Sequence, residues 1–165
     1  MKAGRMTVRV DLKDFKITYE ADGKVLTNIG FRNLGYMQYD RAVLTKFPEP
    51  NYMAAQYQPY MVTELSLDPG ECVYGLGERF TAFVKNGQVV DIWNEDGGTA
   101  SQISYKNIPF YVTSKHYGVF VDHSDNVSFE VASEKVENVG FSVKGEEIRY
   151  HVIYGDDIKG VMETY

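Results

Sequence analysis

The sequence is poor in several features that would point to other classes of protein. Its 165 residues include one cysteine, Cys72, so no internal disulfide can form. Because Cys72 lies in an apolar strand pattern, we expect a buried structural thiol there rather than a nucleophile. No apolar run approaches the roughly 18 to 20 residues of a membrane span, and the start, MKAGRMTVRV, lacks the apolar core of a signal peptide. These absences predict a cytoplasmic protein with no membrane partner.

Positive charge and metal-binding patterns are also scarce. The net charge is −6, and no run of Lys or Arg is long enough to follow a phosphate backbone, which argues against nucleic acid as a partner. The histidines are His116, His123 and His151, and no two of them have the spacing of a helical metal site. We therefore expect no metal and no cofactor, with the histidines in ordinary strand or turn positions.

Aromatic residues, in contrast, are abundant. The chain contains 13 Tyr, 9 Phe and 1 Trp, which together make 14% of the sequence. Tyrosine favours half-buried pleated surfaces and also provides platforms for sugar rings. The excess therefore indicates β structure first and a carbohydrate-related role second. The length fits a single domain, residues 1–165.

Alternation of apolar and polar residues dominates the first thirty positions. Met6–Val10 and Phe15–Tyr19 each place an apolar residue at every second position, which predicts strands with one solvated face. Asp22-Gly23 predicts a tight turn into a further strand, Lys24–Ile29. Residues 31–58 show no clear period, so we expect an irregular connection there, with a short helix around Ala42 or Tyr52.

The remaining strands are predicted at regular spacing. An Asp68-Pro69-Gly70 turn follows the first of these strands, Tyr60–Leu67. Near the end of the chain, Gly155-Asp156-Asp157 precedes residues at helical spacing, which predicts a short C-terminal helix. Short strands separated by polar turns are typical of an antiparallel sandwich. The predicted fold is therefore an all-β antiparallel sandwich with one short helix. The predicted strands are Tyr60–Leu67, Tyr117–His123, Val127–Ala132, Val139–Val143 and Ile148–Tyr154, with Tyr105–Tyr111 as a strand entered through the bend at Pro109.

The segment GLGERF, residues 75–80, contains a Gly-x-Gly turn. It could cradle a phosphate, but neither a third glycine nor a helical pattern follows, so a dinucleotide site is poorly supported. Glycines at a bend more often allow positive φ or a close approach of two backbones. We expect Glu78 and Arg79 to form a structural ion pair, with a role in the site as the alternative.

The segment WNEDGGT, residues 93–99, contains the strongest candidate for ligand binding. Glu95 and Asp96 are adjacent, whereas the two carboxyl groups of a glycosidase lie about 5 to 9.5 Å apart across the scissile bond. A carboxylate and an amide on a loop flexed by glycines suit hydrogen bonding to sugar hydroxyls, with aromatic rings stacking nearby. An Asx-turn that caps its own backbone remains the alternative. The candidate substrate-binding residues are Trp93, Asn94, Asp96, Gly97 and Gly98.

Three motifs taken together point to a known family. VYGLGERFTAF, WNEDGGT and YKNIPFYVT, in this order, resemble the N-terminal β-sandwich of glycoside hydrolase family 31, most closely its α-xylosidase branch. The resemblance extends from about Tyr60 to Tyr165. It implies a galactose-mutarotase-like supersandwich ahead of a (β/α)8 barrel that performs retaining hydrolysis of α-glycosides with two barrel aspartates.

Several expectations come from this resemblance alone. Neither catalytic motif of the barrel occurs in the chain, so we expect no catalytic residue here and a catalytic barrel in the same protein as partner. The family's Asn-x-Asp loop reaches over the barrel mouth, and its aspartate matches Asp96; where the family often has a basic residue, this chain has Glu95. The implied substrate is an α-linked oligosaccharide or a xyloside. Exposed sheet edges would favour a homo-oligomer.

Two other functions compete with that of an accessory domain. A free-standing carbohydrate-binding module would bind oligosaccharides without a barrel. An aldose mutarotase would need a carboxylate base and a histidine acid in one cleft. His116 or His123 with Glu130 are the residues that such an activity would use, although no motif supports it.

Overall fold

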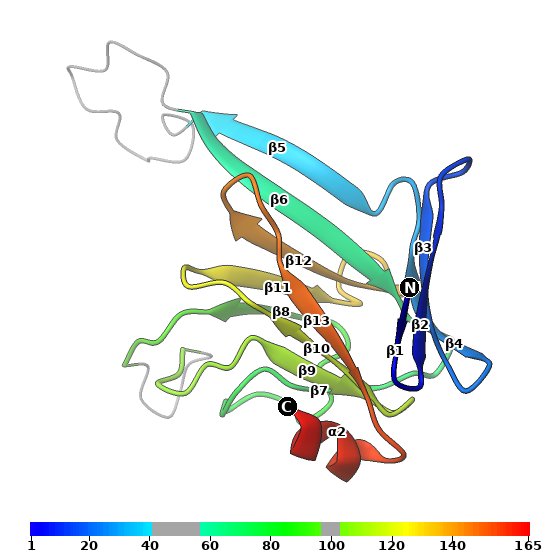
Figure 1. Cartoon of the computed structure of the whole chain (residues 1–165). Helices are drawn as coiled ribbons and strands as arrows, with labels where there is room; N and C mark the ends of the chain where they lie inside the picture. The colour runs from blue at the N-terminus through cyan, green and yellow to red at the C-terminus, as the bar shows by residue number, and fades with distance from the viewer. Residues whose placement is uncertain (41–56, 97–102) are drawn as a thin grey trace.

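The computed structural model describes residues 1–40, 57–96 and 103–165, which form three antiparallel sheets and one short helix (Figure 1). The first sheet contains the N-terminal strands in sequential order. Its hairpin at Asp22-Gly23 has both residues in the left-handed region, with φ of 49° and 76°, as a two-residue turn between twisted strands requires. The strands of this N-terminal sheet are β1 (Lys2–Ala3), β2 (Met6–Asp11), β3 (Lys16–Ala21) and β4 (Lys24–Ile29).

The other two sheets form the sandwich. The five-stranded sheet has the order β5-β6-β12-β11-β8 and the four-stranded sheet the order β13-β10-β9-β7. The strands of the five-stranded sheet are β5 (Leu34–Asp40), β6 (Tyr57–Ser66), β8 (Gln88–Ile92), β11 (Val127–Val131) and β12 (Asn138–Lys144). Those of the four-stranded sheet are β7 (Val73–Gly75), β9 (Phe110–Thr113), β10 (Tyr117–Val121) and β13 (Tyr150–Tyr154).

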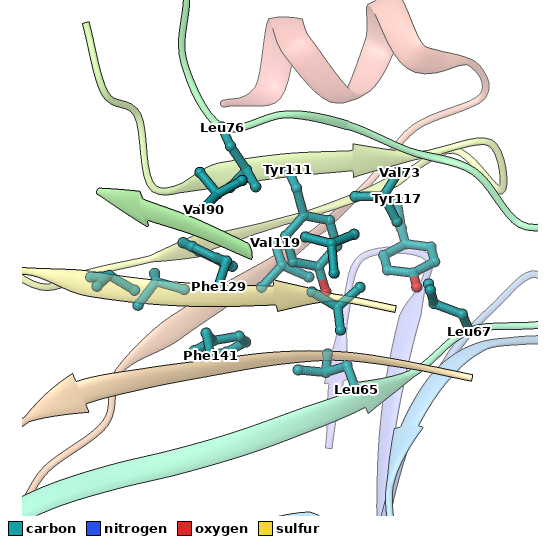
Figure 2. Close-up of a cluster of buried hydrophobic side chains, with 14 of the residues drawn as sticks. Leu65, Leu67, Val73, Leu76, Val90, Tyr111, Tyr117, Val119, Phe129 and Phe141 are labelled. Atoms are coloured by element: carbon teal, nitrogen blue, oxygen red, sulfur yellow. The ribbon is translucent and has the colours of Figure 1, made fainter. Parts of the chain in front are cut away.

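The core lies between these two sheets, as Figure 2 shows, and extends to the N-terminal sheet through Ala21, Leu26 and Ile29. In β11, Val127, Phe129 and Val131 are fully buried while the residues between them are not, so the alternation in the sequence corresponds to the two faces of the sheet. The ring of Phe129 meets that of Tyr111 from β9 edge-on at 6.2 Å, which joins the two layers. The predicted antiparallel sandwich is confirmed.

One prediction for the sheets was wrong. Within residues 31–58, expected to form an irregular connection, residues 34–40 form strand β5 and β6 already begins at Tyr57. β5 is an edge strand with exposed side chains on both faces, including Leu34, Tyr36 and Met37, so burial imposes no alternation on its sequence. The helix predicted around Ala42 or Tyr52 lies outside the described residues.

The C-terminal helix follows the prediction. α2 (Ile158–Thr164) begins after Asp157, whose carboxylate accepts a hydrogen bond from the backbone N–H of Gly160 at 2.7 Å. Val161 is buried against the four-stranded sheet, and the ring of Tyr165 stacks on that of Phe110 at 4.1 Å. The helix therefore covers the outer face of that sheet. No helix in the described ranges is long and apolar enough to cross a membrane.

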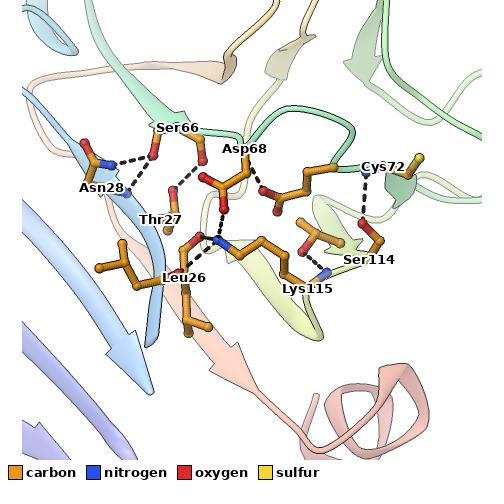
Figure 3. Close-up of polar contacts among 11 residues, drawn as sticks. Leu26, Thr27, Asn28, Ser66, Asp68, Cys72, Ser114 and Lys115 are labelled. Atoms are coloured by element: carbon orange, nitrogen blue, oxygen red, sulfur yellow. Dashed lines mark hydrogen bonds and ion pairs between the residues drawn. The ribbon is translucent and has the colours of Figure 1, made fainter. Parts of the chain in front are cut away.

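A cluster of polar contacts joins the N-terminal sheet to the sandwich (Figure 3). Lys115, in the turn between β9 and β10, donates from Nζ to the carbonyls of Val25 and Leu26 at 2.9 and 2.8 Å and to the carboxylate of Asp68 at 2.7 Å. Thr27 Oγ1 donates to the carbonyl of Ser66 at 2.8 Å. One ammonium group thus connects three segments that lie far apart in the sequence.

We predict that Lys115→Met loosens the N-terminal sheet before the sandwich. The substitution leaves two carbonyls without their donor and removes a charge-assisted bond, so the free energy of unfolding should fall by about 2 kcal/mol. Hydrogen exchange measures both effects, because amide protection in β3 and β4 should fall more than protection in β11 and β12.

Lys13→Met is the matched control, since Lys13 is exposed in the turn between β2 and β3. It should change stability by less than about 0.5 kcal/mol. An equal loss of protection in all three sheets for Lys115→Met would contradict the role of Lys115 in attaching the N-terminal sheet to the sandwich.

The buried tyrosines predict loss of stability at alkaline pH. Burial, reinforced by Glu71, raises the pKa of the Tyr111 and Tyr117 hydroxyls above the ordinary value of 10. The folded state holds these protons more tightly than the unfolded state, so the stabilisation is complete below about pH 10 and declines as the pH rises further. In an alkaline titration followed by tyrosinate absorbance, part of the 13 tyrosines should ionise only at the pH at which circular dichroism shows that the fold is lost.

Tyr111→Phe provides the comparison. The Tyr111 hydroxyl has no hydrogen-bond partner among the described residues, so its removal should change stability at neutral pH by no more than about 1 kcal/mol. The variant should also unfold at higher pH than the parent chain. Ionisation of every tyrosine in a chain with native circular dichroism would contradict the prediction.

Candidate functional site

The Gly-x-Gly turn is a close crossing of two backbones. Gly75, Leu76 and Gly77 all have positive φ, and the backbone N–H of Leu76 donates to the carbonyl of Phe110 at 2.9 Å. A Cβ on Gly77 would lie 2.1 Å from the carbonyl oxygen of Lys106, so no larger residue fits without displacing that backbone. The structural interpretation of this motif is confirmed, and residues 78–96, which follow it, contain no helix that could hold a dinucleotide phosphate.

The ion pair expected between Glu78 and Arg79 does not form. Glu78 instead pairs with Lys106 at 2.9 Å, at the surface. Arg79 donates from Nε to the carbonyl of Leu76 at 3.0 Å and from Nη2 to the carbonyl of Asp91 at 2.6 Å and to Asn107 Oδ1. Burial lowers the pKa of the guanidinium, and the carboxylate of Asp91 partly opposes this shift. Both residues lie in the bend beyond the end of β7, and the two side chains reach different segments.

Asn107 organises the base of the loop that carries Asp96. Its Nδ2 donates to the carbonyls of Trp93 and Ser104, each at 2.7 Å, and to Asn94 Oδ1 at 3.1 Å. Its backbone N–H donates to Asn94 Oδ1 at 2.9 Å. The two ends of the loop are therefore clamped together by one side chain, which in turn is held by Arg79.

Ser104 also holds the base of the loop that carries Asp96. Its hydroxyl is buried and donates to the carbonyl of Glu78, while its carbonyl accepts from the backbone N–H of Glu95 at 3.0 Å. The sequence predicts no role in the site for Asn107 or Ser104, and for Arg79 it predicts one only as the alternative to an ion pair with Glu78. The sequence around Asn107, Asn-x-x-Phe-Tyr, does not indicate that this residue supports the loop, because the contacts concerned join residues about 13 to 28 positions apart.

The candidate substrate-binding residues divide into three groups. The side-chain oxygen of Asn94 is used structurally, as an acceptor for the backbone N–H and for Nδ2 of Asn107, rather than to cap its own turn. Trp93 and Asp96 are exposed, with 54% of the Trp93 residue accessible. Asp96 interacts with the hydroxyl of exposed Tyr105, whose pKa is raised by this neighbour first and by burial second. Gly97 and Gly98 lie outside the described residues.

Two hollows lie on either side of Trp93. The first, of about 320 Å³, combines charged groups with apolar walls and is lined by Arg79, Val89, Asp91, Trp93, Glu95, Ile103 and Asn126. The second, of about 350 Å³, is lined by Ile92, Trp93, Asn94, Asn107, Pro109, His123, Ser124 and Asp125. An exposed indole between two polar hollows, with a carboxylate beside it, can hold a hydroxyl-rich ligand by stacking and hydrogen bonding.

The histidines do not assemble a catalytic pair with Glu130. His123 lines the second hollow, and its Nε2 is buried without a partner among the described residues. Glu130 lies in a separate groove on the outer face of the five-stranded sheet, whose lining contains no histidine. Burial, followed by the neighbouring carboxylate of Glu134, raises the pKa of Glu130. In the described ranges no three His, Cys, Asp or Glu side chains are placed to hold a metal ion.

Cys72 and Tyr105–Tyr111 differ partly from expectation. Cys72 is only half-buried, and its thiol donates to the carbonyl of Gly70 at 3.8 Å. Of the predicted strand, only Phe110 and Tyr111 belong to β9, and both are buried behind Pro109 as expected. Tyr105 is exposed beside Asp96 and belongs to the site instead.

Comparison with known sequences shows that the chain is similar to parts of two α-xylosidases. The chain is 44% identical over 166 residues to the α-xylosidase XylQ of Lactiplantibacillus pentosus, covering 100% of this chain and 20% of that protein. It is 43% identical over 171 residues to an α-xylosidase of Emericella nidulans, covering 99% of this chain and 22% of that protein. The chain therefore spans about a fifth of the length of the curated relatives it matches.

Comparison with solved structures gives the same fold. A GH31 dextranase of Flavobacterium johnsoniae, solved in complex with glucose, superimposes with a TM-score of 0.77 over 98% of this chain and 18% of its own, at 22% identity. The model of the glycosyl hydrolase 31 N-terminal galactose mutarotase-like domain matches residues 2–130. The expected resemblance is confirmed: this chain belongs to the family of glycosyl hydrolase 31 N-terminal galactose mutarotase-like domains.

Proposed function

We propose that this domain serves a hydrolase of α-xylosides or α-glucosides by shaping the substrate-binding mouth of a catalytic (β/α)8 barrel in the same protein. The two relatives named above are α-xylosidases and are about five times longer than this chain, which supports a catalytic domain elsewhere in the protein. The bond-breaking acids would belong to that domain. This chain would contribute position and selectivity.

One observation carries the proposal: an exposed carboxylate and two exposed rings stand on a loop with a rigid base. Asp96 lies beside Tyr105, and Trp93 precedes it on the same loop. Asn107 clamps both ends of the loop, so the side chains above it lose little freedom when a ligand binds. In this role Asp96 accepts hydrogen bonds from sugar hydroxyls while an aromatic ring covers the apolar face of the sugar.

The proposal predicts the effect of Asp96→Ala in the complete enzyme. One charge-assisted hydrogen bond to a sugar hydroxyl contributes on the order of 1.5 to 3 kcal/mol, so kcat/KM for an aryl α-xyloside should fall about ten- to a hundredfold. The melting temperature should not change, because the side chain is exposed.

Asp14→Ala is the matched control, since Asp14 is an exposed carboxylate in the turn between β2 and β3. It should leave kcat/KM unchanged. Asp96→Asn retains the shape of the side chain and should retain part of the activity. An unchanged kcat/KM for Asp96→Ala would remove Asp96 from the site, whatever the activity of the parent enzyme.

A free-standing carbohydrate-binding module is distinguished by titrating this chain alone. If the mouth is completed by the barrel, calorimetric titration with α-linked gluco-oligosaccharides or an α-xyloside should give no measurable heat. Binding stronger than about 1 mM, lost in Asp96→Ala, would instead establish the module. Release of xylose or glucose from a chromogenic glycoside by the chain itself would overturn the accessory role.

A further inference from the structure

β5 forms an edge of the five-stranded sheet, where a strand has a neighbour on one side only. It is seven residues long, and no other edge strand in the described ranges is longer. Its pairing with β6 runs from Leu34 to Asp40 without a register shift. An edge of this kind presents a regular row of backbone donors and acceptors.

The hydrogen bonds of β6 show which backbone groups of β5 face outward. The N–H of Glu64 donates to the carbonyl of Asn33 at 2.8 Å, so the backbone N–H and C=O groups of Asn33 and of every second residue after it point toward β6. The backbone N–H and C=O groups of Leu34, Tyr36 and Gln38 therefore point away from β6. Pro59 of β6 lies opposite Gln38, and its carbonyl accepts a hydrogen bond from the N–H of Gly145, on the side of β6 away from β5. Pro59 therefore forms no backbone hydrogen bond with Gln38, which is consistent with this assignment.

These outward groups have no partner in the described part of the chain. None of its hydrogen bonds outside the ladder uses the backbone N–H or C=O of Leu34, Tyr36 or Gln38. Residues 34–39 contain no proline, no lysine and no other charged residue. The devices by which sheet edges usually resist pairing are therefore missing.

The side chains of this edge are both exposed and held in place. Between 39% and 49% of each apolar or aromatic residue is accessible, namely Leu34, Tyr36, Met37 and Tyr39. The Tyr36 hydroxyl accepts from Gln38 Nε2 at 2.8 Å and donates to Glu146 at 3.3 Å. The ring of Tyr39 meets that of Tyr60 edge-on at 5.5 Å. An ordered edge loses less entropy on pairing than a mobile one.

We propose that β5 pairs antiparallel with β5 of a second copy of this chain, so that two five-stranded sheets become one continuous sheet across a two-fold axis. With the axis at Tyr36, Leu34 of each copy lies opposite Gln38 of the other. The outward-facing backbone groups of Leu34, Tyr36 and Gln38 in one copy then pair with those of the same three residues in the other copy, which makes the interface isologous. This inference concerns assembly and does not depend on the proposed role of Asp96.

A second copy fits this edge by shape. On one face, Tyr36 meets its counterpart as an aromatic cross-strand pair. On the other face, Gly35 lies opposite Met37, so the bare backbone of one strand leaves room for the long side chain of the other. Residues 34–39 themselves carry no charge; the carboxylate of Glu146, 3.3 Å from the Tyr36 hydroxyl, is the charged group that this arrangement brings near the axis in each copy.

Substitution of Gln38 tests the proposal with a matched pair. Gln38→Pro removes one outward N–H and leaves the ladder to β6 intact, whereas Gln38→Ala retains that N–H. Sedimentation equilibrium of the 165-residue chain across the micromolar range should show a dimer for the parent chain. The dissociation constant should rise at least about tenfold in Gln38→Pro and change less than about threefold in Gln38→Ala.

Circular dichroism establishes whether Gln38→Pro is folded. If it is not, Tyr36→Glu replaces it, since this substitution places two carboxylates against each other at the axis, where Glu146 of each copy adds to the negative charge; Phe80→Glu, at a ring that is 71% exposed in a loop after β7, is its control. Tyr36→Glu should give monomers and Phe80→Glu dimers. A parent chain that stays monomeric at every concentration, or a folded edge variant that dimerises like the parent, overturns the proposal.

Discussion

The candidate site depends on one close approach of two backbones, between Gly77 and Lys106. Since a Cβ on Gly77 would lie 2.1 Å from the carbonyl of Lys106, the two segments can meet only because position 77 has no side chain. This contact brings Arg79 to Asn107, and Asn107 to both ends of the loop that carries Asp96. A local property of one glycine thus fixes the frame of a loop that begins sixteen positions away, at Trp93.

The division of roles within the loop follows from this frame. Asn107 and the side-chain oxygen of Asn94 form hydrogen bonds to backbone groups and to each other, so they hold the base of the loop in place. Asp96, Trp93 and Tyr105 stand above the base and are exposed. Since Asn107 supports the loop while a carboxylate and two aromatic rings are exposed, the arrangement fits the selection of a sugar that we propose rather than its cleavage.

The three sheets also have different roles. The sandwich buries its large side chains between two layers. The N-terminal sheet is attached to it both by apolar residues that enter the same core, among them Leu26 and Ile29, and by polar contacts centred on Lys115 (Figure 3). The five-stranded sheet exposes one edge, β5, on the opposite side from β8, which leads into the site loop. Assembly through β5 would therefore leave the loop accessible to a catalytic domain.

The sandwich, the turn at Asp22-Gly23 and the helix after Gly155-Asp156-Asp157 could be predicted from the sequence, because each depends on residues that are neighbours in the chain. Alternation could not identify β5, since an edge strand exposed on both faces is not constrained to a period of two. Tertiary structure alone decided the partners of Glu78, Arg79 and Asn107 and the outward direction of Tyr36. Those contacts arise only when segments distant in the sequence are brought together, and no local pattern records which side chains will then meet.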